Sequence, residues 1–355
     1  MMRMLKNLSV SSSPHLRDNI STRRIMGDVI IAMMPAAVAS IWFFGLRSLI
    51  LMAVSVLCAV AAEAYYQKKS KQTVTVSDLS AVVTGLLLAF NLPANAPWWL
   101  AAVGSILAIV LIKQIFGGLG QNFMNPALAA RAILFISWMA LMASYPFPAP
   151  GQLMTGLAPD AVDAISKATP LMTAKTAAAG AGSLISSTGI TLWQLFMGQV
   201  PGVLGETSKL ALVIGFAYLL YRRVLGWRIP VIFIATVFVC YLVMEGLRLP
   251  AYMEAANGDA ASAWGIVFSN SLFQVLSGSV FLGAIFMATD YSTSPMTGVG
   301  KIIMGLGCGI LLFVIRTFSA YPEGCSFAIL FMNVATPLID RLTIPRSFGE
   351  VKQHG

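Results

Sequence analysis

Charged residues are scarce in this sequence: Asp, Glu, Lys and Arg make up 10% of the 355 residues, whereas 57% are hydrophobic. A soluble domain carries about a quarter charged residues. The 23 Lys and Arg and 14 Asp and Glu residues cannot cover the core of a soluble chain of this length. This scarcity excludes a soluble enzyme, a disordered chain and a nucleic-acid binder, and it predicts a protein embedded in the lipid bilayer.

Cysteine and histidine are also rare. The four cysteines, Cys58, Cys240, Cys308 and Cys325, lie far apart with no C-x-x-C spacing, and there are only two histidines. These residues cannot supply the closely spaced ligands typical of zinc sites and iron–sulfur clusters. We therefore expect no metal site in this chain, and we interpret the cysteines as small side chains packed in the membrane.

Apolar runs are abundant instead, and each can be compared with the roughly 20 residues that cross a bilayer. Ten candidate spans lie at about 29–46, 48–67, 79–93, 98–116, 124–144, 207–221, 229–247, 264–289, 299–315 and 324–339. Two are interrupted: one ends in Asn91-Leu92-Pro93, and another follows Pro201, Gly202 and Gly205. Non-helical backbone at membrane depth is tolerated only beside protein or a polar cavity, so both breaks are expected to line a site.

The basic residues predict the orientation, because cytoplasmic loops are rich in Lys and Arg. With a cytoplasmic N-terminus, sixteen of the 23 Lys and Arg residues lie on that side and six on the other, with Arg131 inside a span. Most of the net charge of +9 is therefore interpreted as membrane anchors. Both termini are predicted to be cytoplasmic. Arg17, Arg23 and Arg24 precede the first run, which we interpret as a retained helix and not as a removable signal.

The spans divide the chain into five parts: a cytoplasmic segment 1–28, a first five-helix repeat 29–144, an extracytoplasmic loop 145–206, a second five-helix repeat 207–339 and a cytoplasmic tail 340–355. The tripeptides Phe123-Met124-Asn125 and Phe331-Met332-Asn333 occupy matching places in the two halves. Five spans precede the second copy, so the repeat would be inverted. The predicted fold class is an all-α integral membrane protein with about ten transmembrane helices in two inverted five-helix repeats.

The outer loop contains the run Asp163-Ala164-Ile165-Ser166-Lys167-Ala168-Thr169. Its pattern, D-x-x-S-x-A-T, resembles the flavinylation motif in which FMN is joined through its phosphate to a threonine hydroxyl. Asp163, Ser166 and Ala168 match the motif around Thr169, and Lys167 departs from it. Taken alone, a seven-residue pattern is equally consistent with a polar surface turn.

Three further runs occur in the order and spacing of one family. They are Gly117 to Leu128, Pro201 to Ser208 and Phe286 to Asp290. Over nearly the whole chain the sequence resembles the family of the D subunit of the Rnf (also called Rsx) electron transport complex. The same family includes its relative, the B subunit of the sodium-translocating NADH:quinone oxidoreductase.

The resemblance implies a membrane subunit of an ion-translocating electron transport complex in the bacterial inner membrane, with covalent FMN on Thr169 in a periplasmic loop. Electrons would pass between partner subunits, coupled to Na+ or H+ translocation, and a link through the phosphate leaves the flavin ring free to carry them. The implied partners are other membrane and peripheral subunits, including a covalent-flavin subunit and iron–sulfur subunits, and a flavin transferase for maturation. No catalytic residue and no NADH site are expected in this chain.

Two glycine-containing runs are further candidates for flavin contacts. Gly205, Glu206, Thr207 and Ser208 open the sixth span on the same face as Thr169, where free amides could hold a flavin phosphate. A plain glycine turn with a helix cap is the alternative. The run 117–120 lies on the opposite face and lacks the strand–helix context of a dinucleotide site. It indicates either close helix packing or a second pocket, for a non-covalent flavin such as riboflavin or for a quinone.

Ionisable residues in or near the spans are candidates for an ion pathway, because they are costly there. The resemblance favours Asp290 and Asp340, at the cytoplasmic ends of the eighth and tenth spans, for the route by which a cation enters. The alternative for each is snorkelling or pairing at the membrane surface. Glu63, Arg131 and Glu245 also lie in or near spans, and Arg131 could satisfy carbonyl groups in the interior.

Two other classes of function fit the same architecture. Broken helices and inverted repeats suit a redox-free secondary transporter or channel for a small solute equally well, and a purely structural scaffold is also consistent with the composition. Flavin on Thr169 is the feature that separates an electron carrier from both.

Overall fold

The computed structural model describes residues 21–151, 168–177, 182–319 and 323–344, which are helical throughout apart from turns and connecting segments. The helices are α1 Thr22–Phe44, α2 Leu46–Lys69, η2 Val76–Asp78, α3 Ser80–Phe90, α4 Trp98–Ile106, η3 Leu107–Gln114, α5 Pro126–Ser137, α6 Met139–Met142, α7 Pro170–Ala177, α8 Leu184–Thr188, α9 Leu192–Met197, α10 Lys209–Tyr221, α11 Arg228–Leu247, α12 Leu249–Ala255, α13 Ala260–Leu276, α14 Val280–Leu282, η5 Gly283–Met287, α15 Gly298–Phe318 and α16 Cys325–Thr343. No strand occurs in the described ranges. The all-helical prediction is confirmed.

Five helices, α1, α2, α11, α15 and α16, are long and apolar enough to cross a membrane. The pair formed by α13 and the segment 280–287 would make a sixth span, bent by 59° at its break. The remaining four predicted runs are shorter apolar helices: α3, α4 with η3, α5 and α10. Large apolar side chains such as Ile31, Leu57 and Phe331 stay exposed, as expected of surfaces that face lipid. These helices indicate a multi-pass membrane protein. Ten crossings in two inverted repeats remain a prediction.

The short helices end where the sequence predicts breaks, and two breaks meet. The Leu204 N–H donates to the Leu92 carbonyl at 3.0 Å, and the Gly205 N–H donates to the Phe90 carbonyl at 2.9 Å. Pro93 and Val203 form an antiparallel bridge beside them. A Cβ atom on Gly205 would overlap the Phe90 side chain, which explains the glycine. Each break thus satisfies backbone groups that the other leaves free, as burial in a membrane requires.

A third break separates α13 from α14 at residues 277–279. Gly278 has φ +70°, a conformation that glycine adopts without strain. The Arg316 guanidinium donates to the Gln274 carbonyl at 2.8 Å and to the Ser277 carbonyl at 3.1 Å. Arg316 is 4% exposed. The charge count assigned Arg316 to the outer face, and the structure shows that it is a buried residue whose charge caps the carbonyl end of α13.

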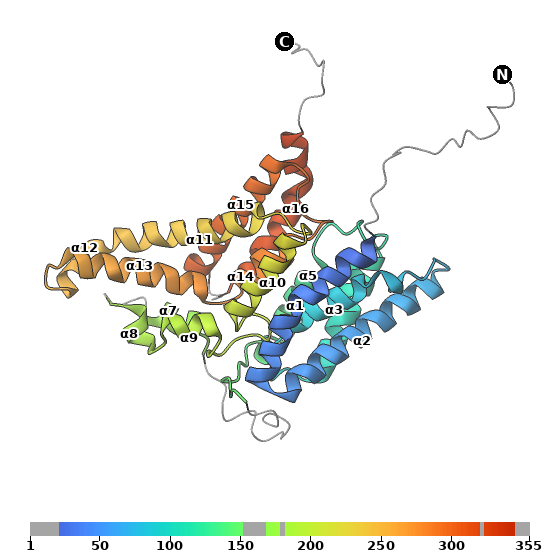
Figure 1. The fold of residues 1–355 in the computed structure, drawn as a ribbon, viewed down its shortest axis with the longest axis horizontal. Coiled ribbons are helices and arrows are strands. Elements are labelled where there is room, and N and C mark those ends of the chain that lie inside the picture. The colour runs from blue at the N-terminus through green and yellow to red at the C-terminus, as the bar shows by residue number, and fades with distance from the viewer. Residues whose placement is uncertain (1–20, 152–167, 178–181, 320–322, 345–355) are drawn as a thin grey trace, which may run out of the picture.

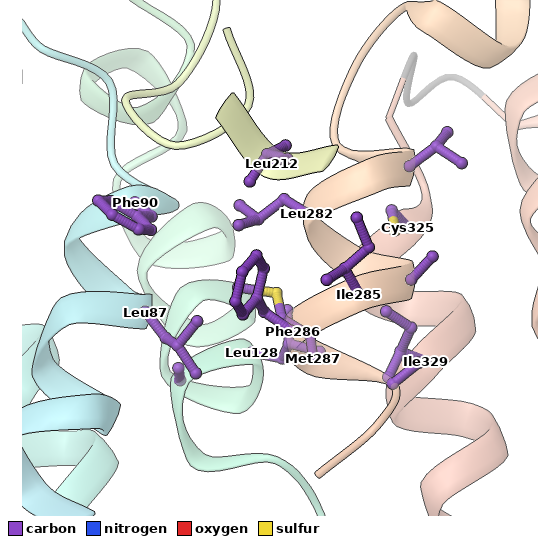
Figure 2. Packing of buried hydrophobic residues seen from close by; sticks show 14 of the residues in the cluster. Leu87, Phe90, Leu128, Leu212, Leu282, Ile285, Phe286, Met287, Cys325 and Ile329 are labelled. Carbon is purple, nitrogen blue, oxygen red and sulfur yellow. The ribbon is translucent and has the colours of Figure 1, made fainter. Parts of the chain in front are cut away.

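The two halves have equivalent neighbours: α2 packs against α3 and α4, and α11 packs against α13 and α15. They meet along α1 with α10 and α5 with α16. The core between them contains side chains from both halves, with Leu87 and Phe90 facing Leu282 and Phe286 (Figure 2). Such equivalence is what a repeat requires.

The two repeat-related asparagines also lie in this core. Asn125 caps α5, with its side-chain oxygen accepting from the N–H groups of Ala127 and Leu128. With the Asn333 amide oriented so that its oxygen accepts, it bonds the Asn125 N–H at 3.1 Å. The matching tripeptides of the two halves therefore meet at one place in the interface.

The helix ends separate into two groups. Asp28, near the start of α1, pairs with Arg222, which follows α10, at 3.1 Å. The start of α10 lies instead beside the 168–177 segment. Figure 1 shows α7, α8 and α9 on the side of the molecule away from the end of α16. The Thr169 region thus lies at the opposite end of the bundle from the start of α1 and the end of α16.

Candidate functional site

Thr169 lies directly before α7 and is 6% exposed. Its side-chain oxygen accepts a hydrogen bond from the Met172 N–H at 3.3 Å, as an N-cap residue does. Ala168 is exposed, whereas Asp163 and Ser166 lie outside the described residues. A small cavity of about 10 Å³ adjoins Thr169, and its polar lining residues are Thr169, Glu206, Thr207, Lys209 and Glu323.

The run 205–208 contributes to this cavity in part. Glu206 and Thr207 line it. Gly205 makes the close contact with Phe90, and the Ser208 side chain caps α10 by accepting from the Ala211 N–H at 3.3 Å. The structure thus brings Glu206 and Thr207 to the Thr169 cavity, whereas Gly205 packs against Phe90 and Ser208 caps the start of α10.

Lys209 supplies a cation to the same cavity. It is 1% exposed, and its Nζ donates to the Glu206 carbonyl oxygen at 2.7 Å. Arg316 is close enough to interact with it electrostatically. The charge count assigned Lys209 to the outer face, and the structure shows that it is buried there beside the Thr169 cavity.

Arg131 joins the cavity region to the broken helix α3. It donates to Asn91 Oδ1 at 3.1 Å and to Ser326 Oγ at 2.7 Å, and it forms an ion pair with Glu323. Its described partners are side-chain oxygens from two segments, the end of α3 and residues 323–326, and not the main-chain carbonyl groups that were one interpretation from the sequence. Arg131 therefore fixes the relative positions of α3, α5 and α16.

The two acids of this cluster have pKa values displaced in opposite directions. Burial raises the pKa of Glu206, and the charge of Glu323 raises it further, whereas Lys209 opposes both effects. Burial also disfavours the charged form of Glu323, but Arg131 outweighs it and leaves the Glu323 pKa below its usual range. Glu206 is therefore the member of the pair that keeps a proton near neutral pH.

A second, larger cavity of about 80 Å³ lies toward the opposite end of α10. Its polar lining residues are Ser80, Thr84, Lys113, Asn122, Asn125, Thr289, Asp290, Tyr291 and Ser292. Beside it, Lys113 Nζ pairs with Glu63 Oε1 at 2.8 Å, and both side chains are at most 2% exposed. Lys113 is thus a buried partner of Glu63, which corrects its interpretation as a surface anchor.

The two predicted ion-pathway acids lie at this end, Asp290 on the segment between η5 and α15 and Asp340 in α16. Asp290 lines the cavity and accepts from Ser292 Oγ at 2.9 Å, and burial raises its pKa. Asp340 accepts from the Met296 N–H at 3.0 Å, which ties α16 to the segment that follows η5. Asp290 therefore faces an internal space, whereas Asp340 holds the wall of that region in place.

The glycines at 117, 118 and 120 have φ values of +113°, +92° and +87°. Gly120 has no neighbouring atom within 4 Å of a built Cβ position. The glycines are thus explained by a left-handed turn after η3, and close helix packing, one of the two interpretations from the sequence, does not account for them. Asn122, just after this turn, lines the larger cavity.

The described residues contain no group of three His, Cys, Asp or Glu side chains that could hold a metal ion. Around Thr169 the charged groups are three cations, Arg131, Lys209 and Arg316, and two acids, Glu206 and Glu323. The excess of positive charge suits an anionic ligand in the cavity. Glu323 was missed by sequence reasoning because it lies in a short connection, and its only signal is an acid directly before an apolar span.

Known proteins resemble this chain over nearly its whole length. A model of the NQR2, RnfD, RnfE family matches residues 9–349. The D subunit of the Na(+)-translocating ferredoxin:NAD(+) oxidoreductase complex of Acetobacterium woodii is 46% identical over 98% of this chain and 96% of the relative. The D subunit of the proton-translocating ferredoxin:NAD(+) oxidoreductase complex of Clostridium ljungdahlii is 38% identical over 97% of each. The D subunit of the ion-translocating oxidoreductase complex of Halorhodospira halophila is 36% identical over 96% of this chain and 95% of the relative.

Proposed function

The chain belongs to the NQR2, RnfD, RnfE family, and from that premise we propose that it is the D subunit of an ion-translocating oxidoreductase complex, with FMN attached covalently to Thr169. Electrons pass through it between partner subunits, and their transfer is coupled to Na+ or H+ movement. Relatives are named for either ion, so similarity favours neither. The partners are the other membrane and peripheral subunits, among them a covalent-flavin subunit and iron–sulfur subunits.

The observation that carries this proposal is the cationic cavity at Thr169. A phosphodiester on the Thr169 oxygen is anionic, and Lys209 lines the same cavity with Arg316 nearby. Charge-assisted hydrogen bonds from Lys and Arg are the usual way in which proteins hold a phosphate group. The flavin supplies reversible electron transfer when bound. The residues present therefore fit the phosphate end of an FMN group.

Thr169 also fits the covalent link in its local geometry. Esterification keeps the side-chain oxygen, so the Met172 N–H can still donate to it and cap α7. Since Thr169 is 6% exposed, a flavin transferase must reach it before the 168–177 segment docks into the cavity. Attachment is therefore expected during maturation and not on the folded protein.

The larger cavity is the candidate place for a second, non-covalent flavin such as riboflavin, or for a quinone. Its volume of about 80 Å³ is below the range of about 300–1,000 Å³ usual for small-molecule sites, so its walls would have to open around such a ring. Apolar walls with amide groups at Asn122 and Asn125 suit a flat, partly polar ring. The 13 residues of α10 separate the two cavities by about 20 Å at 1.5 Å per residue.

The arrangement of the helix ends supports the predicted orientation. Thr169 lies at the opposite end of the bundle from the start of α1 and the end of α16. We propose that both termini are cytoplasmic and that the Thr169 loop is periplasmic, in the inner membrane. A reporter inserted after Lys167 should read periplasmic, and a cytoplasmic reading would reject this orientation.

In-gel flavin fluorescence tests the attachment. The full chain, coexpressed with a flavin transferase and then denatured, should give a fluorescent band that Thr169→Val abolishes. Thr173→Val is the matched control, because Thr173 lies one turn away in α7 and bonds the Thr169 carbonyl. A dark wild-type band, or one that Thr169→Val leaves bright, would reject the covalent FMN and favour a redox-free transporter.

A further inference from the structure

Two carboxyl groups beside the Thr169 cavity, Glu206 and the 17% exposed Glu323, each have a buried oxygen that lacks an ordinary partner. Glu206 is 4% exposed, and its Oε2 atom has no hydrogen-bond donor among the described residues. The same holds for Oε1 of Glu323. A buried acceptor without a donor costs about 1–3 kcal/mol. Such an atom in a native site needs a physical explanation.

Both residues line the same small cavity, and each acid influences the protonation of the other, so their side chains are neighbours. Ionised carboxylates only accept hydrogen bonds, so two of them can bond each other only when one carries a proton. Arg131 pairs with Oε2 of Glu323 and stabilises the charged form of that acid. Lys209 instead donates to the main-chain carbonyl of Glu206 and not to its side chain. The Glu206 O–H group is therefore the donor and the Glu323 carboxylate the acceptor.

We propose that Glu206 and Glu323 form a proton-binding site, in which one proton is shared between their facing oxygens next to the Thr169 cavity. The charged groups that face it come from three helices: Arg131 of α5, Lys209 of α10 and Arg316 of α15. With one proton on the two acids, these three cations leave a net positive charge. The site therefore keeps its excess of positive charge while the proton is bound.

The ligand of this site is a proton and not a metal cation. A metal cation would need several further oxygen ligands, whereas Arg131 and Lys209 occupy adjacent positions with positive charge. The described residues place no third acid here. A proton needs only the two facing oxygens, and it removes the repulsion between them.

The site has one consequence that rests on the proposed function. Negative charge arriving in the Thr169 cavity lies close to the pair and makes the bound proton harder to lose. Electron arrival at a flavin on Thr169 would then be accompanied by retention or uptake of a proton at Glu206 and Glu323. The proton site itself requires no flavin.

Infrared difference spectroscopy of the full chain in lipid nanodiscs tests the site. We expect a protonated carboxyl C=O stretching band that persists near neutral pH, above the usual carboxyl pKa of about 4.3. Glu206→Gln should remove the band, and Glu206→Asp should restore it at a shifted frequency. Glu254→Gln, at an exposed acid, is the matched control and should leave it unchanged. The Thr169→Val chain should keep the band, which separates this proposal from the flavin attachment.

Two other outcomes would reject the proton site. Persistence of the same band in Glu206→Gln would assign it to another acid. Loss of the band when choline chloride is replaced by sodium chloride at equal ionic strength would show that a cation displaces the proton. If Glu206→Gln does not fold, Glu323→Gln provides the same test, because without its acceptor the Glu206 band must shift.

Discussion

The two cavities, at opposite ends of α10, differ in how their charges are balanced. Near the larger cavity, Glu63 and Lys113 form a one-to-one buried pair. Around the Thr169 cavity, Arg131, Lys209 and Arg316 face two acids, of which one holds a proton. Asp290 also lines the larger cavity and lies close enough to Lys113 to interact with it, so acids outnumber bases there. The cluster at Thr169 has more cations than acids, so it has positive charge left for an anion.

The buried ion pairs at the two ends predict the largest effects on stability. Removing one partner of a buried ion pair costs about 3–5 kcal/mol, because the other charge stays buried. Arg131→Met and Lys113→Met should each lower the free energy of unfolding by an amount of that order. Denaturant unfolding in detergent measures both, and Arg24→Ala, at an exposed arginine, is the control.

Double variants then distinguish the two ends. Glu63→Gln with Lys113→Met should recover most of the lost stability, because that pair has no other strong partner in the described chain than Gln114 and Ser80. Glu323→Gln with Arg131→Met should recover little, because Glu206 and Asn91 both lose a partner. Equal recovery at the two ends would show that the clusters do not differ.

The contact between the two helix breaks predicts a smaller effect. Gly205→Ala places a methyl group against Phe90, and such overpacking costs about 1–3 kcal/mol. Gly226→Ala is the control, since Gly226 has no neighbour within 4 Å and no positive φ. Thermal unfolding measures both, and a harmless Gly205→Ala would contradict the close approach of 201–205 to α3.

The pH dependence of stability gives the smallest effect. Burial raises the Glu206 pKa above its unfolded value, so its stabilising proton is fully present at low pH and is lost as pH rises through the folded value. The free energy of unfolding should therefore fall as pH rises from the usual carboxyl value of about 4.3 to the folded value of about 8, by at most about 1.4 kcal/mol per pH unit for one proton, and level off above it. Glu206→Gln should flatten this slope, and Glu254→Gln should not. An unchanged slope in Glu206→Gln would locate the titrating group elsewhere.

The positions of the helices could be predicted from the sequence because hydrophobic runs and Gly/Pro breaks are local signals. Each of the ten predicted runs coincides with an apolar helix or a bent helix pair. The helix lengths could not be predicted, because α3 ends and the segment before α10 begins a break where residues 90–93 and 203–205 bond each other. That contact joins segments more than a hundred residues apart, and no local pattern encodes it.

The charged residues of the site were the hardest part to predict. Counting basic residues by membrane side treats every Lys and Arg near a span as an anchor, yet Lys113, Lys209 and Arg316 are all buried. Lys113 is buried because Glu63 pairs with it from another helix. Arg316 is buried because its guanidinium donates to a carbonyl group at the end of α13. Such pairings depend on tertiary packing. Thr169 was identified by its motif, and its neighbours became visible only in the fold.

The most direct test of the account is the mass of the peptide that contains Thr169. The full chain, matured with a flavin transferase, is digested and fragmented in a mass spectrometer. We expect an adduct of FMN joined through its phosphate, with loss of water, and fragment ions that place it on Thr169. An unmodified Thr169, or an adduct on Thr173 or Thr176, would contradict the assignment of Thr169 as the flavin-bearing residue.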